Sequence, residues 1–141
     1  MRFMTLYKPG REVDGPPREA ELAALGQLIE EMTKAGVLIA TDGLAPSSEG
    51  ARVRISDAGF TVTDGPFAET KELVAGYAII EVESKQEAIA LAKRFLRVMG
   101  EGESEIRLMH QGPNCEPATS PERSDARERH GAPVAARGEG R

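Results

Sequence analysis

Two stretches with helical periodicity, each flanked by strand-like stretches, limit most strongly how this chain folds. They span about residues 17–35 and the segment after Ser84. Their apolar residues predict one buried stripe per helix: Leu22, Leu25, Ile29 and Met32 in the first, and Ala88, Leu91, Ala92 and Phe95 in the second. A helix between two strands needs a crossover connection, and crossovers pack on a face of the sheet. The pattern therefore predicts an α+β domain with two such units.

Short apolar or alternating runs predict the strands at residues 2–7, 37–40, 51–55, 60–63, 76–82 and 105–110. The sequence Ser-Asp-Ala-Gly joins the third and fourth runs and is typical of a hairpin turn. Gly36 and Gly100 are natural helix ends, and Ser84 with Glu87 forms a capping box. The expected order is thus βαβ, hairpin, βαβ.

The expected sheet has apolar side chains on both faces. The strands at 2–7 and 76–82 carry apolar groups on both sides, and they include Phe3, Tyr7, Tyr77 and Ile79. Two helices can cover only one face, so the other face needs a different cover. A second copy of the same sheet is the simplest cover, and a homodimer is therefore expected.

Between the predicted hairpin and the fifth strand lies the string DGPFAETKE, residues 64–72. Its Gly-Pro pair is a strong turn signal, and its ionisable side chains surround one large apolar residue, Phe67. A loop of this kind is suited to a small-molecule site, and it is equally typical of a solvated corner.

The same string, followed by Gly76 and Tyr77, resembles the signature of the DGPF branch of the YCII-related proteins. Residues 1–7, 35–38, 43–44 and 84–95 resemble other parts of that family's pattern, so that the likeness covers roughly the first 110 residues. The resemblance implies a ferredoxin-like domain that pairs into a dimeric α/β barrel, with a mostly unassigned biochemical role. It also implies an accessory link to extracytoplasmic-function sigma factors, beside which DGPF-type proteins are often encoded. Some members use a His–Asp pair with the His on the first helix, but this chain has no His between residues 17 and 35.

Two residues are candidates for acid–base chemistry. In the functional interpretation, Asp64 is a general acid or base, or an anchor for a polar ligand. In the structural interpretation, Asp64 caps the loop by accepting hydrogen bonds from backbone N–H groups. His110 is the one His before the tail, and it is either a catalytic group or an exposed residue at a strand end.

The ligand-binding candidates are Tyr7, Asp64, Phe67, Thr70, Lys71 and Tyr77. Lys71 and Thr70 would hold a zwitterionic or phosphate-bearing ligand, or they lie in a solvated loop. Glu69 and Glu72 are expected to be solvated. Tyr7 and Tyr77 would line a pocket between two sheets, or simply pack across a dimer contact. The first functional hypothesis is therefore an enzymatic or ligand-sensing site in the barrel near residues 64–71. The alternative is a non-catalytic interaction module linked to sigma-factor regulation.

Composition narrows the classes of function. The net charge of −5 argues against non-specific nucleic-acid binding. A single Cys, at position 115, excludes an internal disulfide framework and a multi-Cys zinc site, and no phosphate-binding or metal motif is found, so no cofactor is expected. No signal peptide or membrane-length apolar run is seen, which favours the cytoplasm. Residues 112–141 are rich in Pro, Gly, Ser and Arg and are interpreted as a flexible tail after a domain at 1–111.

Overall fold

A computed structural model describes residues 1–12 and 17–110 of the chain. The elements, in chain order, are β1 (Arg2–Lys8), α1 (Glu19–Lys34), β2 (Leu38–Gly43), the 3-10 turn η1 (Ser47–Glu49), β3 (Ala51–Ser56), β4 (Gly59–Asp64), β5 (Gly76–Glu81), α2 (Lys85–Met99) and β6 (Glu103–Leu108). The predicted α+β class and the predicted order of elements are confirmed. Neither helix in this part of the chain has the length and apolar character needed to cross a membrane. The predicted tail lies outside the described residues.

The strands of the main sheet lie in the order β2-β5-β1-β6, and every neighbouring pair is antiparallel. The β3–β4 hairpin forms a separate two-stranded sheet between β2 and β5 in the sequence. This order, with α1 and α2 as the two crossovers, is consistent with a ferredoxin-like fold. The dimeric barrel depends on a second copy of the chain and stays a prediction.

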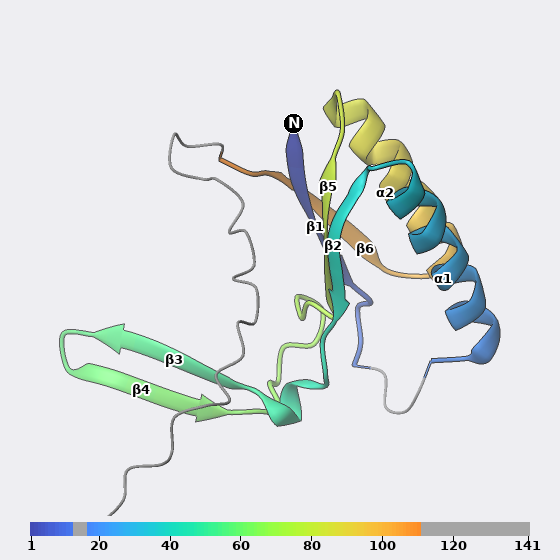
Figure 1. The fold of residues 1–141 in the computed structure, drawn as a ribbon. Coiled ribbons are helices and arrows are strands. Elements are labelled where there is room, and N and C mark those ends of the chain that lie inside the picture. Colours follow the sequence, from blue (N-terminus) through green and yellow to red (C-terminus); the bar gives the residue numbers. More distant parts are fainter. Residues whose placement is uncertain (13–16, 111–141) are drawn as a thin grey trace, which may run out of the picture. The chain divides into compact units, whose positions relative to one another are not determined.

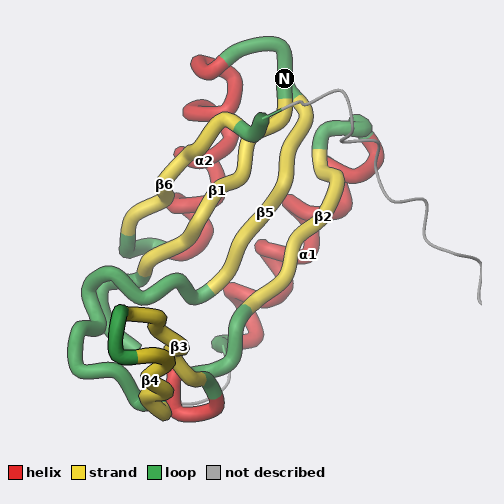
Figure 2. The backbone as a smooth tube through the Cα atoms, turned by 90° about the vertical axis from the view of Figure 1, so that its left-hand side faces the viewer, coloured by secondary structure: helices red, strands yellow, loops and turns green. Residues whose placement is uncertain are grey.

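Both helices cover the same face of the main sheet, as Figures 1 and 2 show. Phe3 of β1 and Ile80 of β5 point toward the helices and pack with Val82 and Ala88 in the buried core. Side chains alternate along a strand, so the neighbours of Phe3 on β1 and of Ile80 on β5 point to the opposite face of the sheet, which we call the open face. Its apolar side chains are half-buried and oppose each other in register, Met4 with Ile79 and Leu6 with Tyr77.

The helix ends follow the local sequence. The Ser84 hydroxyl accepts a bond from the Glu87 backbone N–H at 3.2 Å, and Gly100 ends α2 with a φ of 79°. The predicted stripe of α1 is partly wrong. Leu28, which the prediction omitted, is buried, whereas Leu22 is 49% exposed. Leu22 lies in the first turn of α1.

The DGPF stretch is a tightly built corner at the base of the hairpin. The Gly65 N–H donates to the Gly50 carbonyl at 3.0 Å, and the Phe67 N–H donates to the Ser47 hydroxyl at 3.1 Å. The Ser47 N–H in turn donates to the Glu12 carboxylate at 2.7 Å. A Cβ atom at position 65 would overlap the Ser47 carbonyl group, so this position requires glycine. The corner thus fixes where the hairpin leaves the sheet.

Candidate functional site

A cavity of about 340 Å³ lies between the helices and the covered face of the sheet. Its volume lies in the range of small-molecule sites. Most of the wall is apolar and comes from both helices and the sheet: Leu25, Leu28, Ile29, Met32, Leu38, Ala78, Ile80, Leu91, Ala92 and Phe95. The space exists because the side chains packed around Phe3 fill only part of the layer between helices and sheet.

Hydroxyl groups supply the polar part of the cavity wall. Thr5 and Tyr7 come from β1, Thr41 comes from β2, and Ser104 lies opposite Tyr7 on β6. The Thr41 hydroxyl donates to the Tyr77 carbonyl at 2.9 Å. The cavity therefore combines apolar walls with a few neutral hydrogen-bonding groups, a combination that fixes the orientation of a bound small molecule.

Tyr7 is held in place by several contacts. Its ring meets the Phe95 ring edge-on, with centroids 5.1 Å apart, and its hydroxyl donates to the Glu101 carbonyl at 3.0 Å. Gly102 has a φ of 101°, and a Cβ there would lie 2.7 Å from the Tyr7 ring, so glycine lets the chain pass close to it. Burial, reinforced by the nearby carboxylates of Glu101 and Glu21, raises the pKa of Tyr7. Tyr7 therefore stays protonated near neutral pH.

Tyr77 lies at the same level of the sheet but points to the open face. Tyr77 pairs with Leu6, whereas Tyr7 pairs with Gly76. Alternation therefore turns the Tyr77 side chain away from the cavity, and Tyr77 lines the cavity through its backbone. Its hydroxyl donates to the Asp42 carboxylate at 3.1 Å, and this bond raises the pKa of Tyr77. The two phenols are thus separated by the sheet.

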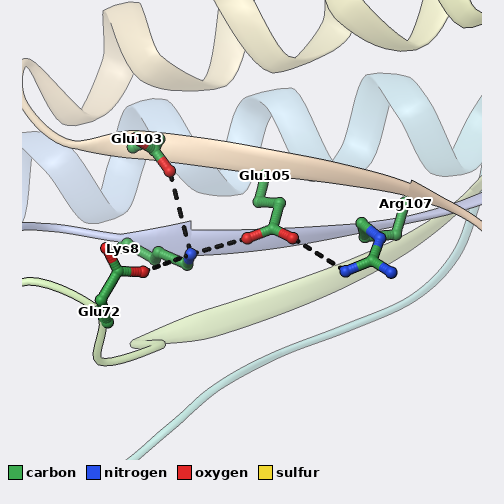
Figure 3. Close-up of polar contacts among 5 residues, drawn as sticks. All are labelled: Lys8, Glu72, Glu103, Glu105 and Arg107. Carbon is green, nitrogen blue, oxygen red and sulfur yellow. Dashed lines mark hydrogen bonds and ion pairs between the residues drawn. The ribbon is translucent and has the colours of Figure 1, made fainter.

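A charged cluster occupies the open face where β1 and β6 meet the end of the DGPF loop (Figure 3). The Lys8 ammonium group lies 2.7 Å from Glu105, 2.9 Å from Glu72 and 3.9 Å from Glu103, and its side chain is only 11% exposed. Arg107 contacts Glu105 at 3.1 Å. Hydrogen bonds to Glu105 and then Glu72 raise the pKa of Lys8, and the bond from Lys8 lowers the pKa of Glu105. Lys8 is therefore a fixed cation and no nucleophile, and it ties three segments together.

The predicted site residues do not gather in one place. Tyr7 and Tyr77 line the cavity, whereas the other candidates are absent from its wall: Asp64, Phe67, Thr70, Lys71 and His110. Asp64 is exposed at the end of β4, and His110 is exposed after β6. Phe67 is half-buried, with the Arg52 guanidinium 3.9 Å above its ring. Their proposed ligand-binding and catalytic roles stay predictions.

Sequence reasoning missed two parts of this arrangement. The cavity lies on the helix side of the sheet, and its wall uses the same helix positions that the periodicity assigned to a filled core. The second part is the charged cluster around Lys8, which includes the exposed Glu72. Alternation along β1 places Lys8 with Met4 and Leu6, which was the available signal for a charged group on the open face.

Ionisable side chains are few among the residues that line the cavity. Asp42 is the one carboxylate among its lining residues, and its strand position pairs with Tyr77 on the open face. The phenol of Tyr7 is kept neutral by its surroundings, so it offers a hydrogen-bond donor and acceptor rather than a base. Within residues 1–12 and 17–110, no group of three or more His, Cys, Asp or Glu side chains is placed to hold a metal ion.

Comparison with known proteins gives one family match. The model of the YCII-related domain matches residues 1–111. A protein of Rhizobium meliloti (strain 1021), the uncharacterized protein R00369, is 35% identical over 75 residues, which are 53% of this chain and 60% of that protein. The chain thus spans less than two thirds of this relative's length.

Among solved structures, a similar chain is the 5-chloro-2-hydroxyhydroquinone dehydrochlorinase from Burkholderia phenoliruptrix AC1100, in complex with 2,5-dihydroxybenzoquinone. The match covers 79% of this chain and 96% of that one, with 13% sequence identity and a TM-score of 0.40. At this level of similarity the neighbour's activity carries no information about this chain. The DGPF branch and the sigma-factor link, which are finer assignments, stay predictions.

Proposed function

This chain belongs to the YCII-related domain family, and we propose that it binds a small molecule in the cavity between α1, α2 and the sheet. One observation carries this proposal: a cavity of about 340 Å³ with apolar walls and hydroxyl groups in part of its lining. Apolar walls with a few well-placed polar groups are typical of small-molecule sites of this size.

The chemistry of the wall defines the ligand class. An anionic ligand would lose its hydration without gaining an ionic partner, because Lys and Arg are absent from the residues that line the cavity. The one lining carboxylate, Asp42, already accepts a hydrogen bond from Tyr77. A neutral molecule of mainly apolar character, with one or two hydrogen-bonding atoms, fits this wall better. Its polar atoms would be placed next to the hydroxyls of Tyr7, Thr5 and Ser104, while its apolar part would contact both helices.

The cavity is complete within one chain, which separates it from the site expected between two sheets. A site bordered by residues 64–71 in a dimeric barrel needs a second copy of the chain. We therefore propose the helix-side cavity as the primary site and keep the inter-sheet site as the competing location. The two locations lie on opposite faces of the same sheet, so that ligand-contact experiments can tell them apart.

The test uses N-phenyl-1-naphthylamine, a neutral apolar probe whose fluorescence rises when water is excluded. We expect saturable binding to the full-length protein. Ala92→Leu adds bulk to the cavity wall from α2 and should weaken probe binding at least tenfold. Ala90→Leu makes the same change on the exposed side of the same helix and should leave binding within twofold of the wild type.

Circular dichroism of both variants checks that α2 is retained. The proposal is wrong if the wild-type protein shows no saturable binding. It is also wrong if Ala92→Leu, with its helical spectrum intact, binds the probe as well as Ala90→Leu does.

A further inference from the structure

The β3–β4 hairpin has one apolar face and one polar face. Val53 opposes Val62 and Ile55 opposes Phe60, so these side chains share a face, which we call the arm face. Their exposed fractions are 67%, 64%, 70% and 75%, respectively. The other face carries Arg52, Arg54, Thr61 and Thr63. An alternating pattern this regular is typical of a strand pair with one buried face, yet the arm face is bare.

The hairpin needs more support than its own chain supplies. A lone two-stranded hairpin is marginally stable in water, and every residue of β3 and β4 is exposed. The contacts that hold it lie at its base, where Gly65 bonds to Gly50 and Arg52 stacks on Phe67. These contacts leave the arm face uncovered.

Outside the described residues, the given sequence offers few side chains for this cover. Apart from prolines and Cys115, its apolar side chains larger than alanine are Val13 and Val134. Four large apolar groups need a matching apolar surface, which two valines cannot provide. A second molecule can supply such a surface.

The direction of the hairpin favours a second copy of this chain as that molecule. Figures 1 and 2 show the hairpin extending from the main sheet on the side opposite the helices. This is the side of the open face, where Met4, Leu6, Tyr77 and Ile79 are half-buried within one chain. A body that covers the open face therefore lies next to the hairpin.

We propose that the β3–β4 hairpin is a dimerisation arm whose apolar face packs against a second copy of this chain, the same copy that covers the open face. The areas favour using both surfaces. Burying an aliphatic or aromatic side chain removes roughly 60–120 Å² from water. The four side chains of the arm face are about two-thirds exposed, so this face alone supplies roughly 170–330 Å². A stable interface needs about 800 Å² per partner, so the arm face alone is too small and the open face has to contribute as well. In a symmetric pair each copy contributes both surfaces.

The test compares two variants of the full chain by sedimentation velocity over a concentration series. Val62→Asp places a charge on the arm face, and Thr61→Asp places the same charge on the opposite face of the same strand. We expect a wild-type dimer, a dissociation constant at least tenfold higher for Val62→Asp, and a value within threefold of the wild type for Thr61→Asp. A monomeric wild type at about 100 μM, or equal effects of the two variants, would overturn the proposal.

A second measurement keeps the proposal testable if Val62→Asp unfolds. Phe60 is replaced by the photo-crosslinking residue benzoylphenylalanine, and copies labelled with ¹⁴N and ¹⁵N are mixed, left to exchange and irradiated. We expect crosslinked peptide pairs that combine the two labels. Pairs carrying a single label only, or no crosslinked product, would show that the arm face does not meet a second copy. Neither experiment depends on the cavity, so their results test the dimerisation arm independently of the proposed ligand binding.

Discussion

Replacing Gly65 by alanine tests whether the DGPF stretch is a structural corner. The added methyl group would overlap the Ser47 carbonyl, which is backbone and cannot move aside like a flexible side chain. Overpacking of this kind costs about 1–3 kcal/mol. Moving the corner also strains the bonds from Gly65 to Gly50 and from Phe67 to Ser47, each worth about 0.5–1.5 kcal/mol. Gly→Ala recovers about 0.4–1 kcal/mol through the unfolded chain.

The expected result is therefore a loss of about 1–6 kcal/mol in the free energy of unfolding, measured by urea denaturation followed by circular dichroism. Gly26→Ala is the matched control, because a Cβ there meets nothing within 4 Å and the residue lies inside α1. It should raise the free energy of unfolding by about 0.5–1 kcal/mol. The reasoning is refuted if Gly65→Ala is as stable as the wild type, or if the two substitutions shift the urea midpoint in the same direction.

Three further predictions concern protonation and helix capping. The raised pKa of Tyr7 contributes stability that is present below pH 10 and is lost as the pH rises further. Tyr7→Phe should therefore flatten the alkaline limb of the plot of unfolding free energy against pH, and phenolate absorbance checks the titration of Tyr7 directly. The lowered pKa of Glu105 contributes stability that is lost as pH falls below its ordinary value of 4.5. Lys8→Met should therefore reduce the loss of stability in acid, and an unchanged acid limb would contradict the role given to Lys8. Ser84→Ala should lower the free energy of unfolding by about 1 kcal/mol because α2 loses its cap, and a change below about 0.3 kcal/mol in urea denaturation would argue against the cap.

Much of the fold could be predicted because its signals are local. Period-2 and period-3.6 patterns, the Ser84 cap and the glycines at 36 and 100 each act within a few residues of the chain. Alternation also separated Phe3 and Tyr7 from Met4 and Leu6, so the two faces of β1 followed from the sequence.

The site was harder to predict because it depends on what is missing from the packing. The sequence shows that Leu25, Met32 and Leu91 face the sheet, but it does not show that their volumes leave a cavity between them. The charges of residues 64–72 favour a binding loop, but the described hydrogen bonds of this loop, at Gly65 and Phe67, hold the backbone in place. The ion pair between Lys8 and Glu72 joins residues 64 positions apart, and no local pattern reports such a contact.

The most direct test of the proposed binding site is to locate a bound ligand by NMR. The protein is labelled at its methyl groups, saturated with N-phenyl-1-naphthylamine, and examined for nuclear Overhauser effects from the probe. We expect effects to Leu25, Leu28 and Leu91 in the helix-side cavity. Effects to Met4, Leu6 and Ile79 instead would place the ligand on the open face and contradict the account.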